Sequence, residues 1–181
     1  MKNKFSHLIV LLLFFSCHSP EARRPVTVSS GSRILESAKT SKMIYEEDAA
    51  DIKAYLSRLD SIKIYSSNSG FWYYYDSRDS TYSETPKPGD LTQLTYQIED
   101  LKNEIIYDSL SLGLIQYTVD KEVLFKGLRE GIKLMYPGQR VTFLFPSELA
   151  YSYTGDKNLI GTNEPLVCKV HLYSIEKDSI Q

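Results

Sequence analysis

Cysteine and histidine, the residues that most often hold metals or act as nucleophiles, are scarce in this chain. It has two cysteines, Cys17 and Cys168, which are too few for a disulfide scaffold or a thiolate zinc site. Two of its three histidines, His7 and His18, lie in or beside the N-terminal leader, so only His171 remains for the folded part. We therefore expect no metal site, and we interpret Cys168 as a small buried hydrophobic residue rather than a nucleophile.

The motifs of nucleotide-dependent and covalent enzymes are absent as well. The chain has no P-loop, no G-x-G-x-x-G after a strand, no G-x-S-x-G elbow and no H-E-x-x-H. The stretch Ser174–Lys177 matches S-x-x-K without its companion motifs, and we interpret that match as coincidence. We therefore expect no cofactor, and any chemistry would have to come from a binding pocket.

Tyrosine is the abundant residue from which such a pocket could be built, with 14 copies against a single tryptophan. Its amphipathic ring suits half-wet sheet surfaces and binding clefts. The composition is otherwise that of a globular protein, with 42% hydrophobic and 24% charged residues. The formal net charge of -2 excludes a generic basic nucleic-acid binder, so we expect no nucleic-acid partner.

The segment 1–17 has the anatomy of a secretory signal. Two lysines precede an apolar run from Leu8 to Phe15, which is too short to span a membrane as a helix. The segment ends at Cys17, as a bacterial lipoprotein signal does, although Phe14 and Phe15 stand where that pattern has Leu and a small residue. We predict that Cys17 is acylated and anchors the protein in the bacterial cell envelope, on the periplasmic side. The alternative is an ordinary signal peptide with a cysteine there by chance.

The leader is followed by a polar segment and then by a helical pattern. Residues 18–40 are predicted to be a flexible tether, because their first part is polar and holds two prolines and several serines. A helix is predicted over 41–59, with the acidic run 46–48 near its start, where the macrodipole favours acids. Its apolar stripe consists of side chains three or four residues apart: Tyr45, Ala49, Ile52, Leu56 and Leu59. This stripe must pack on the domain or on a partner, and the oligomeric state stays open.

The remainder alternates as a sheet does and holds one short helix. The helix is predicted over 125–135, where apolar residues have helical spacing and Pro137-Gly138 follow. Strands are predicted, in chain order, at 71–75, 91–101, 104–108, 115–119, 139–145 and 166–172. In the last strand, Leu166, Cys168, Val170 and Leu172 are expected to face inward, and Val167, Lys169 and His171 outward. This order indicates an antiparallel α+β domain.

Several segments together resemble the FKBP-type peptidyl-prolyl isomerases. They are Leu94-Thr95-Tyr96, Tyr107-Asp108-Ser109, Gly127 to Gln139, Phe145 to Tyr151 and Asn163-Glu164-Pro165-Leu166. The resemblance runs from about 70 to 175, and its most specific part ends in Leu149-Ala150-Tyr151. It implies a sheet of five or six antiparallel strands wrapped around one short helix in residues 76–177, preceded by a helix-and-strand arm over 41–75. The lipoprotein start and Trp72–Tyr75 also resemble the gliding-motility-associated lipoprotein subgroup of this family.

The resemblance implies an activity and a pocket. The activity is cis-trans isomerisation of X-Pro bonds in proline-containing polypeptides. Asp108 is implied to be the polar group beside the substrate carbonyl, and Tyr151 to donate its hydroxyl to a peptide carbonyl. The rest of the pocket is implied to be apolar or aromatic: Tyr96, Tyr107, Leu124, Phe125, Leu128 and Ile160. Within that set Leu128 would form the floor, and the Phe125 backbone N–H would be available to the ligand.

Three positions depart from the family pattern. Leu128 stands where Trp is common, Cys168 where Phe is usual and Ser152 where Gly is usual. These changes favour weaker binding of the family's macrolide ligands and a reduced isomerase rate. The alternative function is a non-catalytic chaperone or an assembly component with the same fold, and a third alternative is an unrelated structural lipoprotein.

Overall fold

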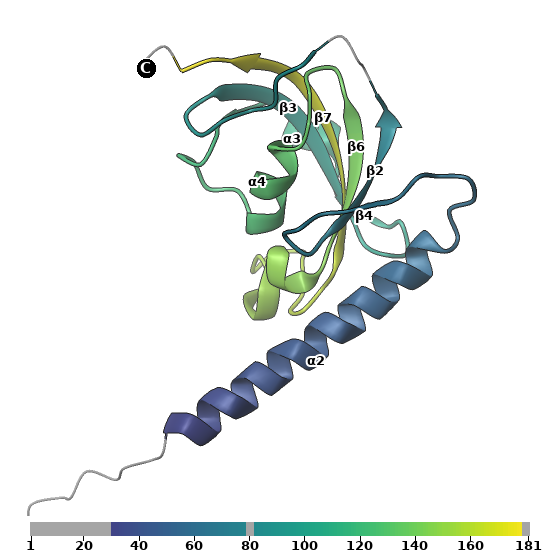
Figure 1. Cartoon of the computed structure of the whole chain (residues 1–181), viewed down its shortest axis with the longest axis vertical. Helices are drawn as coiled ribbons and strands as arrows, with labels where there is room; N and C mark the ends of the chain where they lie inside the picture. The colour runs from purple at the N-terminus through teal and green to yellow at the C-terminus, as the bar shows by residue number, and fades with distance from the viewer. Residues whose placement is uncertain (1–29, 79–81, 179–181) are drawn as a thin grey trace, which may run out of the picture. The chain divides into compact units, whose positions relative to one another are not determined.

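The computed structural model describes residues 30–78 and 82–178 (Figure 1). The chain divides into two compact units, 1–35 and 36–181. In the first unit only 30–35 are described, and they begin helix α2 (Ser30–Leu56). The predicted signal segment with Cys17, and the tether up to residue 29, lie outside the described residues. Among the helices that are described, none has the length and apolar character needed to cross a bilayer.

Helix α2 begins before the predicted start at residue 41, so the part of the predicted tether at 30–40 is helical. Neither Gly nor Pro occurs between Ser32 and Leu56, and most residues there favour a helix. The predicted start was too late because hydrophobic periodicity finds a helix through its buried face, whereas the side chains at 36–43 are exposed. The acidic run 46–48 consequently lies in the middle of α2 and not in its first turn, where the macrodipole would act.

Seven strands form one antiparallel sheet in the described part of the chain: β1 (Tyr65–Ser66), β2 (Trp72–Ser77), β3 (Leu91–Glu99), β4 (Ile105–Tyr107), β5 (Ile115–Thr118), β6 (Arg140–Phe145) and β7 (Leu166–Glu176). Their order is β1-β2-β6-β7-β3-β4, and β5 also pairs with β3. The six predicted strands are all present. The seventh, β1, is too short to show an alternating pattern.

Strand β3 pairs with three other strands, β4, β5 and β7, and carries the first part of the site. It pairs with β7 over its whole length, with Leu94 opposite Leu172 and Ile98 opposite Cys168. The predicted hairpin with β4 is confirmed, and its register sets Tyr107 opposite Ile98. The strand alternates as predicted: Leu94 and Ile98 are buried, and Tyr96 lies half-buried between them.

Helix α4 (Lys126–Ile132) covers one face of this sheet (Figure 1). Leu128 and Ile132 are fully buried in a core to which β3, β6 and β7 also contribute. The helix approaches the sheet closely at Gly127, where a Cβ atom would lie 2.5 Å from a ring carbon of Phe145. The short helix predicted over 125–135 is therefore confirmed in type and place, although it ends at Ile132.

The opposite face of the sheet is covered by the C-terminal half of α2. Ile52, Tyr55 and Leu56 pack there against three buried sheet residues: Tyr74, Leu144 and Val167. The predicted helical stripe therefore packs on the domain. Val167 lies on the opposite face of the strand from Leu166 and Cys168, as predicted, but the expectation of only one buried face was wrong, because Val167 is fully buried beneath α2.

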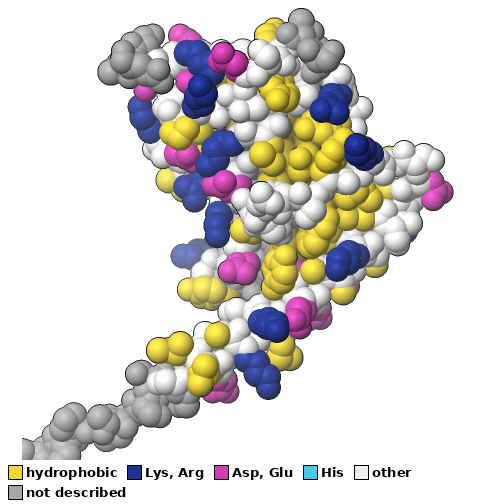
Figure 2. All heavy atoms as spheres, in the orientation of Figure 1, with side chains coloured by type: hydrophobic (Ala, Val, Ile, Leu, Met, Phe, Trp, Pro, Cys, Tyr) yellow, Lys and Arg dark blue, Asp and Glu magenta, His cyan; other side chains and the backbone are white. Residues whose placement is uncertain are grey.

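Tyrosines also line the edge of the sheet formed by β1 and β2. The ring of Tyr73 stacks on that of Tyr65 with centroids 5.3 Å apart and meets that of Tyr75 edge-on at 5.8 Å. Lys63 lies over Tyr65 and Arg78 over Tyr75, at 5.1 and 4.9 Å from the ring centres. Figure 2 shows hydrophobic side chains gathered over this side of the molecule, with lysine and arginine at the margin. This cluster of packed rings, Tyr65, Tyr73 and Tyr75, accounts for part of the high tyrosine content.

Candidate active site

A hollow of about 380 Å³ opens beside Phe125, the residue that caps helix α4. Its lining comes from three segments that are far apart in the chain, namely β3, the loop between β5 and α4, and the segment that follows β6. The lining residues are Tyr96, Val123, Leu124, Phe125, Ala150, Tyr151 and Thr154. The structure thus brings together Tyr96, Leu124, Phe125 and Tyr151, as the resemblance implied.

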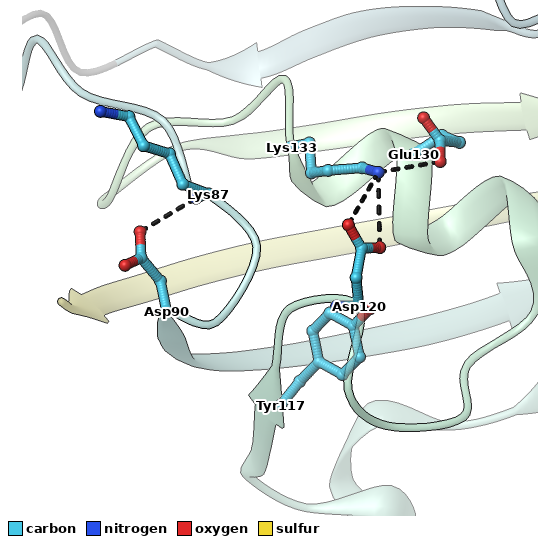
Figure 3. A network of polar contacts seen from close by, with 6 residues as sticks. All are labelled: Lys87, Asp90, Tyr117, Asp120, Glu130 and Lys133. Atoms are coloured by element: carbon cyan, nitrogen blue, oxygen red, sulfur yellow. Dashed lines mark hydrogen bonds and ion pairs between the residues drawn. The ribbon is translucent and has the colours of Figure 1, made fainter. Parts of the chain in front are cut away.

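Polar contacts hold the loop between β5 and α4 in place. Lys133 Nζ lies 3.3 Å from Asp120 Oδ2 and 2.9 Å from Glu130 Oε1 (Figure 3). The pKa of Lys133 is raised, first by its hydrogen bond to Glu130. The Asp120 N–H donates to the Tyr117 hydroxyl oxygen at 3.1 Å. These contacts fix the first part of a loop whose last residues line the hollow.

Phe125 connects the hollow with the core beneath it. Its ring packs edge-on against Phe145, with centroids 5.5 Å apart, and at a tilt against Tyr151 at 5.3 Å. Because Phe125 precedes the first turn of α4, its backbone N–H lies outside the helical hydrogen-bond ladder. Its use by a ligand, which the resemblance implied, stays a prediction.

Tyr151 lies between two short 3₁₀ turns, η2 (Ser147–Leu149) and η3 (Ser152–Thr154). The backbone of Ser152 is left-handed, with φ of 55°. This conformation is strained for a residue with a Cβ atom and is natural for glycine, which the family usually has at this position. The Ser152 carbonyl accepts a hydrogen bond of 2.8 Å from the Asn163 N–H, which helps to keep the turn in this shape.

The hydroxyls of Tyr96 and Tyr151 are available to a ligand. Within residues 30–78 and 82–178 no group makes a hydrogen bond with either of them. Burial is the first cause that raises the pKa of Tyr151, to about 12, and nearby Tyr96 and Asp156 raise it further. Burial likewise raises the pKa of Tyr96. Both side chains are therefore protonated at neutral pH and can donate to a carbonyl oxygen.

A carboxylate that the sequence prediction missed, Asp156, organises the loop beside the hollow. It accepts a short hydrogen bond from the Tyr107 hydroxyl and bonds from the N–H groups of Asn158 and Ile160 at 2.8 and 2.9 Å. Burial alone would raise the pKa of Asp156, but these donors outweigh it and the pKa is lowered. The signal in the sequence was Gly155-Asp156-Lys157-Asn158, which is typical of a turn closed by an aspartate side chain.

The hydroxyl of Tyr107 is used in bonds to the loop at 156–160. Its hydroxyl donates to Asp156 and accepts a bond of 3.0 Å from the Asn158 side-chain amide. The hydrogen bond to Asp156 is the first cause that raises the pKa of Tyr107. Tyr107 packs at the edge of the core that underlies the hollow, but it is not among the residues that line the hollow.

Asp108 lies at the N-terminus of α3 (Ser109–Leu112), directly after β4. Its carbonyl accepts hydrogen bonds from the Leu112 N–H at 3.0 Å and the Ser111 hydroxyl at 2.9 Å. Its side chain is half-buried, makes no capping bond to the helix and does not line the hollow. Its role beside a substrate carbonyl stays a prediction.

The remaining implied residues lie beneath the hollow. Leu128 is fully buried, and Ile160 is 4% exposed in the same core. Cys168 is buried in that core as well, and burial raises the pKa of its thiol, as expected of a small hydrophobic residue. No group of three Asp, Glu, His or Cys side chains in the described part of the chain could hold a metal ion. The hollow can therefore offer an apolar wall and hydroxyl donors to a ligand.

Comparison with protein families assigns the chain. The family model of the FKBP-type peptidyl-prolyl cis-trans isomerases matches residues 82–173, which is about half of the chain. The chain belongs to this family. The match begins after β2, so helix α2 and the first two strands lie outside it.

Individual relatives agree with this assignment. The chain is 31% identical over 94 residues to the peptidyl-prolyl cis-trans isomerase Mip of Coxiella burnetii, a match that spans 52% of this chain and 40% of the relative. Two crystal structures share the fold. A peptidyl-prolyl isomerase from Pseudomonas syringae pv. tomato has a TM-score of 0.61 at 16% identity, over 76% of this chain and 96% of that one. FkpA from Escherichia coli has a TM-score of 0.59 at 21% identity, over 96% of this chain and 82% of that one.

Proposed function

We propose that the protein catalyses cis-trans isomerisation of X-Pro bonds in polypeptides, with the bond bound in the hollow beside Phe125. The observation that carries the proposal is the convergence of Tyr96, Phe125 and Tyr151 from three distant segments on one hollow, with two tyrosine hydroxyls free to donate. Membership of the family and the similarity to Mip of Coxiella burnetii, which is named as a peptidyl-prolyl isomerase, support it.

The chemistry suits a site of this kind. Resonance keeps the peptide bond planar, with a rotation barrier of about 18–20 kcal/mol, and no bond is broken when it rotates. A twisted amide has lost that resonance and is less dipolar, so an apolar hollow disfavours the planar form more than the twisted one. Fixed donors add binding energy that is specific to the twisted form. A 1000-fold acceleration requires only about 4 kcal/mol, which desolvation and one or two hydrogen bonds can supply.

Each residue then has a separate task. Leu124 and Phe125 exclude water from the amide, and the Tyr151 hydroxyl donates to a substrate carbonyl. Tyr96 forms the opposite wall. Asp156 acts indirectly, because its bonds to Tyr107 and to the backbone at 158–160 hold the loop beside the hollow in one conformation.

An isomerisation assay on a proline-containing peptide tests the proposal. The wild-type protein should accelerate the approach to the cis-trans equilibrium, and no rate above background at micromolar protein would remove the enzymatic function. Asp108→Ala and Asp156→Ala separate the two carboxylates. Asp156→Ala should slow the reaction because it releases Tyr107, whereas an unchanged rate in Asp108→Ala would show that Asp108 has no catalytic role while the isomerase itself stands.

A non-catalytic chaperone or assembly component is the second candidate. It is favoured by the position of Asp108 outside the hollow and by Leu128, which stands where the family commonly has Trp, because the site then lacks two side chains of the family pattern. A protein that binds a proline peptide or delays aggregation of an unfolded client, but leaves the isomerisation rate unchanged, would establish this role.

We also propose that the protein is anchored by lipid at Cys17 on the periplasmic side of a bacterial membrane. The support is the leader sequence, which places a cysteine directly after a short apolar run. Its clients would then be exported polypeptides, with the components of a gliding-motility or secretion machinery among them. Cys17→Ser should move the protein from the membrane to the soluble fraction, and a wild-type protein without an acyl mass would contradict the anchor.

A further inference from the structure

A buried carboxylate on helix α2 contacts the segment that carries Tyr151. Asp48 is 4% exposed although it lies inside the helix, directly after Glu46 and Glu47. Its Oδ2 atom accepts two hydrogen bonds from Ser147, one from the backbone N–H at 2.8 Å and one from the hydroxyl at 2.6 Å. A charged group is expensive to bury, and such charge-assisted bonds are what make the burial tolerable.

Ser147 is the first residue of the segment that forms one side of the hollow. It is 1% exposed and begins η2, whose turn is closed by bonds from the Leu149 N–H to Pro146 and from the Ala150 N–H to Ser147. Three lining residues of the hollow follow within the next seven positions: Ala150, Tyr151 and Thr154. A shift of Ser147 would therefore be transmitted through a tight turn to Tyr151.

The bond between Asp48 and Ser147 is not the only place where helix α2 meets the segment that starts at Ser147. A small crevice of about 190 Å³ is lined by residues of both: Ser41, Ile44, Ser147, Glu148, Ser152, Tyr153 and Asn163. The helix is fixed to the sheet at its other end by Ile52 and Leu56. The carboxylate of Asp48 is thus presented from an element that is itself packed on the sheet.

We propose that Asp48 is a positioning residue for Tyr151. By holding Ser147 it sets where the η2 turn starts and hence where the Tyr151 hydroxyl points into the hollow. This inference rests on the proposed isomerase function, and it makes α2 part of the catalytic unit although the helix lies outside the family match at 82–173. Isomerase activity would then depend on a residue that the family pattern does not contain.

The test compares two substitutions of similar size. Asp48→Leu removes the acceptor, and we expect kcat/KM for a proline peptide to fall about 5-fold, the loss expected when the Tyr151 hydroxyl no longer donates to the substrate. Asp48→Asn keeps one carbonyl oxygen that can accept both bonds of Ser147, so its activity should stay within about 1.5-fold of wild type. Asp51→Leu, at an exposed position on the same helix, is the matched control and should leave the rate unchanged.

A double-mutant cycle separates positioning from a general loss of structure. In a Tyr151→Phe background the hydroxyl is gone, so Asp48→Leu should cost less than about 2-fold there. An equal loss in both backgrounds would overturn the proposal, and so would wild-type activity in Asp48→Leu. Circular dichroism below the unfolding transition confirms that each variant is folded.

Amide hydrogen exchange decides the question without an activity readout. Asp48→Leu should accelerate exchange at the amides of Leu149 and Ala150 and leave that of Phe143 in β6 unaffected. Asp48→Asn should keep the protection of the wild-type protein at all three amides. Unchanged exchange at Leu149 and Ala150 in Asp48→Leu would refute the link between α2 and the η2 turn. If the wild-type protein has no isomerase activity, the proposed function fails, and this measurement still tests the contact independently.

Discussion

The substitution Tyr151→Phe is the most direct test of how the hollow works. It removes one hydroxyl and keeps the ring, whose packing on Phe125 at 5.3 Å should survive. Because no group in the described residues makes a hydrogen bond with this hydroxyl, the folded protein loses no internal bond. The whole effect should therefore appear in catalysis and not in stability.

The magnitude follows from the kind of bond that is lost. A neutral hydrogen bond contributes about 1 kcal/mol net, with a spread of about 0.5 kcal/mol either way. Since 1.36 kcal/mol corresponds to a factor of ten in rate, kcat/KM should fall about 5-fold, within a range of about 2- to 12-fold. A larger loss would mean that the hydroxyl faces a more charged transition state than a twisted amide.

The assay is isomerisation of a proline peptide, followed by exchange NMR or by a coupled protease, with thermal unfolding measured in parallel. Tyr153→Phe is the matched control, because Tyr153 lies two residues further on and is 76% exposed. The reasoning is refuted if Tyr151→Phe retains full activity or if Tyr153→Phe loses as much.

Three further predictions concern stability. Ser152→Gly should raise the free energy of unfolding by about 0.5–1 kcal/mol, because φ of 55° is strained for serine; denaturant titration measures it, and a loss of stability would contradict the strain. Gly127→Ala should lower it by about 1–3 kcal/mol, since the new Cβ would lie 2.5 Å from the Phe145 ring; wild-type stability would show that the helix can retreat. Burial raises the pKa of Tyr55 and of Tyr151 to about 12, so the folded state favours their neutral forms. The stability that this preference contributes is complete below pH 10 and is lost as the pH rises to 12; free energies of unfolding that stay flat between pH 10 and 12 would contradict this.

Local patterns in the sequence were sufficient to predict most of the strands and the short helix of the domain. Alternation placed β3 and β7, and helical spacing with Pro137-Gly138 behind it placed α4. The burial of Val167 was missed because alternation indicates which residues share a face of a strand, but it does not reveal that a distant helix covers the other face. The start of α2 was missed for a related reason, since its first turns have no buried face to produce a pattern.

The site was predictable only where side chains meet the hollow directly. Tyr96, Leu124, Phe125 and Tyr151 line it as the family resemblance implied. Asp48 could not be found, because its two hydrogen bonds cross 99 positions of the chain and nothing near it in sequence announces them. Asp156 had a local turn signal, but its bond to Tyr107 depends on how two distant loops pack.

The central place of β6 in the sheet bears on how the protein could be shortened. The family match starts at residue 82, yet β2 pairs with β6 along most of its length, and Phe71 packs edge-on against Phe143 and Phe145 in the core. A chain cut at residue 82 would leave β6 as a bare edge with unpaired amides and carbonyls, and such edges recruit other chains. Aggregation in a trimmed protein would therefore report a missing neighbour strand and not a defective isomerase fold.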